Sequence, residues 1–77
     1  GAANIKSGQS TFNGSAGQTV GIGEELAGVT YDVVITPTAD ALDVGPFWVG
    51  DKTSTTFKVY NWGAGLVGFD WVLVDRN

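Results

Sequence analysis

The chain has 77 residues, with eight acidic and four basic side chains, a formal net charge of −4, and neither cysteine nor histidine. A domain of this size buries only about 60% of its unfolded surface, and small domains usually gain stability from disulfides, a metal ion or self-association. Because the missing residue types exclude disulfides and thiolate or imidazole metal sites, we expect self-association and no metal or cofactor, with carboxylate-bound calcium as the weaker substitute.

The same composition argues against several classes of partner and against catalysis. The four basic residues are far apart in the sequence, so we expect no phosphate-binding patch for nucleic acid and no binding to anionic membranes. No apolar run has the length for membrane insertion. Carboxylates that could act as acid and base occur at Asp40, Asp43, Asp51 and Asp70. A domain this small has little room for a water-excluding cleft, so we predict that the chain is not an enzyme.

Twelve glycines, with many Thr, Val and aromatic residues and few helix formers, predict an all-β fold. Residues 1–9 are expected to be a linker or a short edge strand that continues a longer polypeptide, and residues 10–77 to form the domain. A first strand from Ser10 to Asn13 is followed by Asn13-Gly14, which favours a hairpin turn. The second strand is predicted over Gln18 to Gly23, where apolar residues alternate with small or polar ones.

The next two strong signals are a strand that ends at a proline and a hairpin rich in aromatic residues. Tyr31 to Thr36 alternates as a strand, and Pro37 cannot donate a ladder hydrogen bond. A long loop follows, from Thr38 to Pro46. Phe47 to Lys52 and Thr55 to Trp62 are then predicted to form a hairpin, because turn-forming residues separate them.

The closing strand, Gly68 to Asp75, is apolar on both faces. Side chains alternate along a strand. One face carries Phe69, Trp71 and Leu73, and the other carries Asp70, Val72 and Val74. We therefore predict that the first face packs in the core and that Asp70, Val72 and Val74 contact a neighbouring copy, with Asp70 paired to Lys58, Lys52 or a backbone amide. Six strands at intervals of about ten residues predict an antiparallel sandwich or barrel.

The predicted hairpin also carries the strongest candidate binding site. If it forms, its aromatic and polar side chains come close together: Trp48, Asp51, Lys52, Tyr60, Asn61 and Trp62. Aromatic rings bind the C–H face of a sugar, and carboxylates and amides bind its hydroxyls, so this set is a candidate carbohydrate site. Trp and Tyr are also enriched in subunit interfaces, which is the alternative for Trp48 and Tyr60 in particular.

Four segments together resemble the H-type lectin-like domains, in particular those at the C-terminal ends of bacteriophage tail fibres. They read YDVVITPT from Tyr31, FWVGDKT from Phe47, TFKVYN from Thr56 and FDWVLV from Phe69, within a resemblance that covers Ser10 to Asp75. The resemblance implies a six-stranded antiparallel β-sandwich that forms a homotrimer and binds a sugar or a host receptor. H-type lectins of animal origin bring an arginine and often a histidine to the sugar, whereas this chain has only Arg76 and no histidine.

We therefore expect the C-terminal, carbohydrate-recognising and trimerising domain of a phage or prophage tail fibre, located in the virion tail fibre or outside the cell. Two alternatives stay open. The domain could be a purely structural trimerisation cap without a ligand, or a carbohydrate-binding module attached to a secreted enzyme. The second alternative predicts a monomer, because such a module presents its aromatic face without help from other copies.

Overall fold

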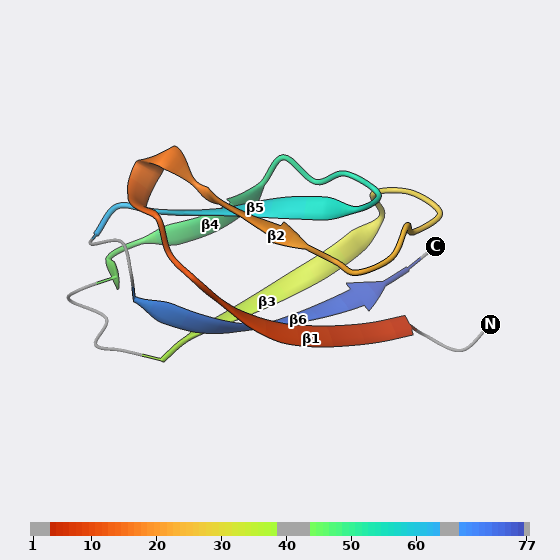
Figure 1. Ribbon diagram of the computed structural model, residues 1–77, viewed down its shortest axis with the longest axis horizontal. Helices are drawn as coiled ribbons and strands as arrows, with labels where there is room; N and C mark the ends of the chain where they lie inside the picture. Colours follow the sequence, from red (N-terminus) through yellow and green to blue (C-terminus); the bar gives the residue numbers. More distant parts are fainter. Residues whose placement is uncertain (1–3, 39–43, 64–66, 77) are drawn as a thin grey trace.

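The computed structural model describes residues 4–38, 44–63 and 67–76, which form two antiparallel three-stranded sheets (Figure 1). In chain order the elements are β1 (Asn4–Thr11), the 3-10 helix η1 (Gly14–Ala16), β2 (Gln18–Gly21), β3 (Tyr31–Pro37), β4 (Phe47–Gly50), β5 (Thr56–Asn61) and β6 (Gly68–Asp75). The predictions of an all-β fold and of six strands are confirmed. Within the described part of the chain, no helix has the length and apolarity to cross a membrane.

The first sheet has the order β1-β6-β3, so the closing strand lies in its centre. Asp75 at the end of β6 is opposite Asn4 of β1 on one side and Tyr31 of β3 on the other. β1 is longer than the run predicted from Ser10, because β6 offers hydrogen-bond partners to the small polar residues before it. An edge strand over Asn4–Thr11 therefore covers most of the segment that was expected to be a linker or a short edge strand.

The second sheet has the order β2-β5-β4. The predicted hairpin between β4 and β5 is confirmed, with Trp48 directly opposite Tyr60. The hairpin predicted at Asn13-Gly14 is wrong, since β1 pairs with β6 and β2 pairs with β5. The chain instead passes through η1 from one sheet to the other, and the Gly14 amide donates to Asn61 Oδ1 at 2.8 Å rather than to a β1 carbonyl.

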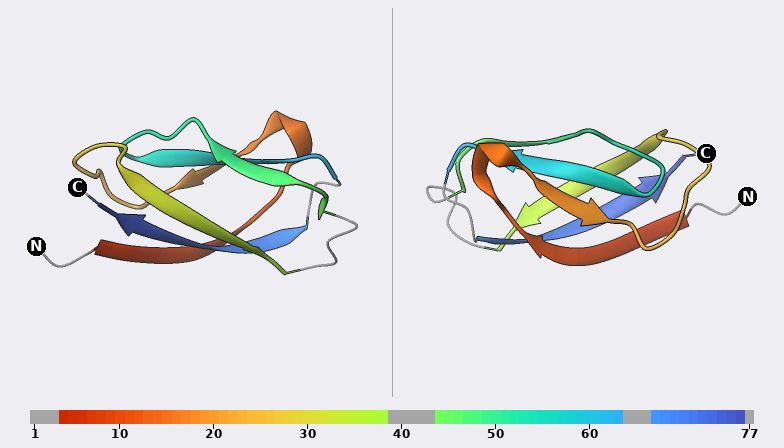
Figure 2. Two further views of the ribbon diagram at one scale, coloured as in Figure 1. Left: turned by 180° about the vertical axis from the view of Figure 1, so that it is seen from behind. Right: turned by 45° about the horizontal axis from the view of Figure 1, so that its top comes forward.

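The apolar core takes alternate residues from the central strand of each sheet. Phe57 and Val59 of β5 are fully buried, as are Phe69 and Leu73 of β6. The two sheets face one another (Figure 2), and the Phe57 ring meets Trp71 of β6 edge-on between them, with centroids 5.3 Å apart. The prediction that Phe69, Trp71 and Leu73 form the core face of the closing strand is confirmed.

The two ends of the molecule differ in what they carry. β1 begins and β6 ends at one end, whereas η1 and the last residues of β5 lie at the other (Figure 1). We call the second end the η1 end. The side chains that follow β5 therefore lie far from the place where the described chain enters the domain.

Candidate functional site

Three aromatic side chains gather on the outer face of the β2-β5-β4 sheet, and we call Trp48, Tyr60 and Trp62 the aromatic platform. The Trp48 and Tyr60 rings stack with centroids 5.4 Å apart and an interplanar angle of 14°. Trp62 is tilted against Trp48, with centroids 6.4 Å apart. Trp48 is 43% exposed and Trp62 is 77% exposed, so the platform offers two indole surfaces to solvent.

Tyr60 is held in place by two glycines and one carboxylate. A Cβ at Gly17 would lie 2.6 Å from Cε1 of the ring, and a Cβ at Gly50 would lie 3.2 Å from Cε2, so the absence of side chains there makes room for both ring edges. The Tyr60 hydroxyl donates a hydrogen bond to Asp51 Oδ2. This bond to a carboxylate, followed by partial burial and by the nearby negative charge, raises the pKa of Tyr60 above its usual 10.0.

Asp51 stands in the left-handed region of backbone space, with φ 47°, which aspartate tolerates better than most residues. The turn after it is fixed by Thr53, whose hydroxyl accepts the Thr56 amide at 2.9 Å. The Tyr31 hydroxyl from the other sheet shares its proton between the Thr53 and Thr56 carbonyls, both at 2.9 Å. A carboxylate has about four acceptor sites, so Asp51 keeps acceptor capacity beyond its bond to Tyr60.

Trp62 follows directly after β5 and is positioned through its backbone. Its amide donates to the Pro46 carbonyl at 3.0 Å, and the next amide, that of Gly63, donates to the Val44 carbonyl at 2.9 Å. These bonds extend the β4-β5 pairing beyond the strands. The indole is therefore exposed on a fixed backbone, at the η1 end.

Lys52, which was predicted as a binding residue, lies outside the platform. Its ammonium donates to the Tyr31 carbonyl at 2.6 Å and lies 5.2 Å from the centroid of the Tyr31 ring. Both contacts draw the side chain towards β3, away from the stacked rings. Sequence alternation placed Lys52 with Trp48, but the strand ends at Gly50 and the alternation ends with it.

Asn61 was also predicted as a binding residue, but the structure places its side chain in the core. It is fully buried, and its side-chain amide connects two backbone groups: Oδ1 accepts the Gly14 amide and Nδ2 donates to the Val44 carbonyl at 3.0 Å. Along β5 it shares the inward face of Phe57 and Val59. A ligand on the outer face has no access to it.

The outer face of the other sheet carries the predicted interface residues. Exposed or half-buried aliphatic side chains from all three strands form what we call the aliphatic stripe: Ile5, Val34, Val72 and Val74. Ile5 is 66% exposed and Val34 is 57% exposed. Asp70 lies on the same face of β6, two residues before Val72. Its Oδ1 has no hydrogen-bond partner among the described residues. The predicted bond to Lys58, Lys52 or a backbone amide is therefore not formed at this oxygen.

Two residues considered for calcium, Asp40 and Asp43, lie outside the described residues. Within residues 4–38, 44–63 and 67–76 no group of three or more acidic side chains is placed to hold a metal ion. Gly17 was missed as a contributor to the platform, because only the close approach of the Tyr60 ring explains it.

No protein-family model matches the chain, and no curated protein or solved structure is significantly similar to it.

Proposed function

We propose that this chain is the C-terminal receptor-binding and trimerising domain of a phage or prophage tail fibre, and that its aromatic platform recognises a cell-surface carbohydrate. In this proposal the two sheets form the β-sandwich of an H-type lectin-like domain, and three copies associate outside the cell. The observation that carries carbohydrate recognition is the solvent-exposed pair Trp48 and Trp62 beside a carboxylate with free acceptor sites.

The chemistry of the platform suits a pyranose. The ring of a sugar presents a patch of C–H groups that packs on an aromatic face, and its hydroxyls need acceptors at the edge of that face. Trp62 offers the more open indole. Asp51 offers carboxylate oxygens at the rim of the platform, where Tyr60 already holds it in one orientation. Because Trp48 stacks on Tyr60, which the two glycines flank, little side-chain entropy is lost at these two rings on binding.

The location of the platform also supports a receptor-binding role. Trp62 follows β5 at the η1 end, whereas β1 begins at the opposite end (Figure 1). A fibre that enters the domain before Asn4 would therefore present the platform at its far end. This is the place from which a fibre tip reaches a cell surface.

A glycan array tests carbohydrate recognition. We expect the wild type to bind specific glycans, and Trp62→Ala to weaken that binding by roughly tenfold or more, as loss of one aromatic contact predicts. Trp48→Ala should weaken it as well. Val29→Ala is the matched control, because Val29 is 51% exposed in the loop after β2 and lies outside the platform.

Two results would contradict the proposal. Absence of binding to any glycan would remove the recognition role, and binding that survives both tryptophan substitutions would place the sugar elsewhere on the chain. Far-UV circular dichroism of each variant confirms that the fold is kept.

A second function, the purely structural trimerisation cap, is favoured by one observation. The aliphatic stripe exposes apolar side chains on a sheet face that none of the described residues covers. A cap predicts that deletion of the domain prevents fibre assembly, whereas a receptor-binding tip can be lost with the fibre intact. Light scattering separates both from a module attached to an enzyme, for which the mass of a monomer is expected.

A further inference from the structure

Lys58 is the basic side chain next to the aromatic platform. The other three basic side chains are engaged: Lys6 with Glu24, Arg76 with Asp32, and Lys52 with the Tyr31 carbonyl. Lys58 makes no hydrogen bond or ion pair within the part of the chain that the structure describes. It is half-buried on the outer face of β5, two residues before Tyr60.

Lys58 and the platform form one continuous surface. Gly50 of β4 is directly opposite Lys58, and a Cβ at Gly50 would lie 3.2 Å from Cε2 of the Tyr60 ring. The edge of the ring therefore extends to the residue that faces Lys58. Along β5 the backbones of Lys58 and Tyr60 are only about 7 Å apart, at about 3.3 Å per residue. A ligand that packs on the rings is thus within reach of the lysine side chain.

The rim of this surface offers both an acceptor and a donor. Asp51 accepts the Tyr60 hydroxyl and keeps further acceptor sites, whereas the ammonium group of Lys58 has only donors. The two side chains form no ion pair with each other among the described residues. A ligand that suits both supplies hydroxyl groups to Asp51 and an anionic group to Lys58. A hexuronic acid does this, because a carboxylate replaces the hydroxymethyl group of the neutral hexose.

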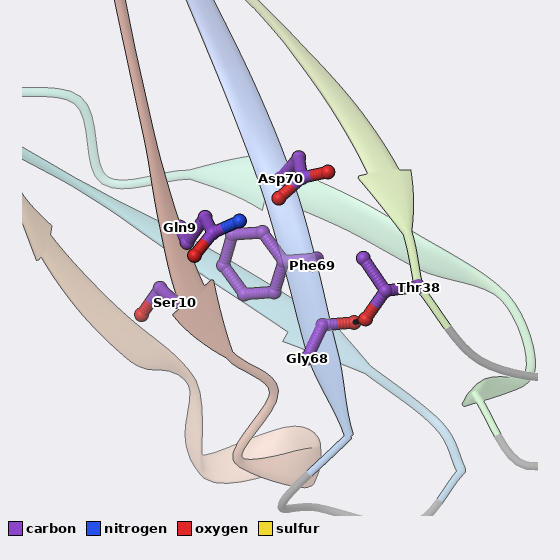
Figure 3. Close-up of a pocket in the computed structure, with 6 residues that line it drawn as sticks. All are labelled: Gln9, Ser10, Thr38, Gly68, Phe69 and Asp70. Carbon is purple, nitrogen blue, oxygen red and sulfur yellow. Dashed lines mark hydrogen bonds between the residues drawn. The ribbon is translucent and has the colours of Figure 1, made fainter.

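A hollow elsewhere on the chain does not suit such a sugar. It has a volume of about 140 Å³ and lies on the β1-β6-β3 sheet, beside Gln9 and Asp70. Figure 3 shows the Asp70 carboxylate next to the Gln9 side chain there. The described residues that line the hollow include this carboxylate and no basic side chain, and the ring of Phe69 is only 1% exposed. An acidic sugar would meet a like charge there and no open aromatic face.

We propose that the carbohydrate recognised by the platform is acidic: a saccharide with hexuronic acid units, whose C–H face packs on Trp48 and Trp62 and whose carboxylate pairs with Lys58. This inference rests on the proposed carbohydrate recognition and names its substrate class. A bond between an ammonium group and a carboxylate is stronger than one to a neutral hydroxyl. The net charge of −4 does not oppose it, because charges beyond about 8 Å are largely screened at physiological salt.

Matched pairs of sugars test the inference. The probes are the methyl glycosides of glucose and galactose and those of the corresponding uronic acids, followed by the tryptophan indole N–H signals at about 0.15 M salt. We expect at least one uronic acid to bind roughly 3- to 10-fold more tightly than its neutral partner. Salt of about 1 M should reduce this preference, because the Debye length falls to about 3 Å.

Two variants show whether Lys58 is responsible. Lys58→Met keeps the apolar stem and loses the charge, so the preference for the uronic acid should disappear while the neutral sugar binds as before. Lys6→Met is the matched control, since it changes the net charge equally at a residue of β1 that pairs with Glu24. It should keep the preference. Circular dichroism checks the fold of both variants.

The outcomes separate this inference from the function on which it rests. Equal affinity for a uronic acid and its neutral partner, or a preference that survives in Lys58→Met, would overturn the acidic ligand and leave the platform as a sugar site. Sodium acetate that shifts the same signals as strongly as the uronic acid would also overturn it, because the anion alone would then suffice. If none of the four glycosides shifts the Trp48 or Trp62 signal, recognition and this inference are both contradicted.

Discussion

The outer faces of the two sheets differ although the sheets are built alike. Each sheet has three antiparallel strands with the central one fully buried on its inner side. The aromatic face is organised internally, because Tyr60 is stacked, flanked by glycines and bonded to Asp51. The aliphatic face exposes Val34 and Ile5 and leaves Asp70 Oδ1 without a partner among the described residues.

This difference indicates what kind of partner each face has. A face whose aromatic rings stack on one another and whose Tyr60 hydroxyl is already bonded needs no protein partner to hold it and is free to bind a small ligand. A face that exposes aliphatic side chains beside an unpaired acceptor gains most from a protein surface that supplies both apolar cover and a donor. We therefore assign recognition to the aromatic face and assembly to the aliphatic face.

The largest expected effect concerns Asn61, which belongs to the core and not to the aromatic face. Asn61→Ala leaves the Gly14 amide without its partner and removes one of the two donors to the Val44 carbonyl, and we expect the free energy of unfolding to fall by about 2–4 kcal/mol. Denaturant unfolding measures it. Asn13→Ala is the control, since its bond to the Gly17 carbonyl is exposed and should be worth less than about 1 kcal/mol. Equal losses in the two variants would contradict the assignment.

The next effect concerns the aliphatic stripe. Val72→Lys places a charge among the exposed aliphatic side chains, and we expect self-association to weaken by at least about tenfold, or about 1.4 kcal/mol. The long lysine stem still covers the neighbouring valines, so folding of the single chain should persist. Sedimentation velocity compares this variant with Val29→Lys, the same substitution in a loop. Loss of association in both variants would show that net charge, not the stripe, is responsible.

A third effect tests how the platform is positioned. Gly17→Ala puts a methyl group within 2.6 Å of the Tyr60 ring and a side chain at φ 86°, so we expect a loss of about 1–3 kcal/mol and a displaced Tyr60. Gly21→Ala has no heavy atom within 4 Å of the added Cβ and should be neutral or slightly stabilising. Thermal unfolding and the tyrosine NMR signals measure both. An undisturbed Tyr60 in Gly17→Ala would show that the glycine is not needed there.

The smallest effect is on the titration of Tyr60. The raised pKa means that the neutral hydroxyl is favoured in the folded state, so the bond to Asp51 contributes below the usual pKa of 10.0 and is lost as the pH rises through the higher folded value. In Asp51→Asn the pKa of Tyr60 should fall. Tyr31 is an internal control in the same NMR titration, because its pKa is raised by burial and does not depend on Asp51. An unchanged Tyr60 would contradict the bond.

Local periodicity was enough to predict the central strands but not the pairing of the edges. The alternation of β6 is regular, so the burial of Phe69 and Leu73 and the exposure of Val72 follow from the sequence. β1 could not be predicted in full, because its residues form a strand only through pairing with β6. The two strands are far apart in the sequence: even the nearest pair, Thr11 and Gly68, is separated by more than 55 positions.

The same contrast explains the outcome at the candidate site. Trp48 and Tyr60 lie on one face because the hairpin register is local. Asn61 is two residues after the buried Val59, so alternation along the strand already predicts that Asn61 points inward. It was nevertheless counted as a binding residue, because asparagine is a residue type common in sugar-binding sites. The position of the Lys52 side chain could not be predicted from the hairpin alone, since its hydrogen-bond partner is the carbonyl of Tyr31 in the other sheet.

The most direct test of the central claim uses the three tryptophan indole N–H signals in a nitrogen-15 NMR titration. The probes are methyl pyranosides of glucose, galactose, mannose and N-acetylglucosamine. Trp71 is buried against Gly8 and serves as the internal reference, whereas Trp48 and Trp62 form the exposed platform. We expect at least one sugar to shift the Trp62 and Trp48 signals and to leave the Trp71 signal unchanged. Carbohydrate recognition by the platform is contradicted if no sugar shifts any indole signal, or if the Trp71 signal alone responds.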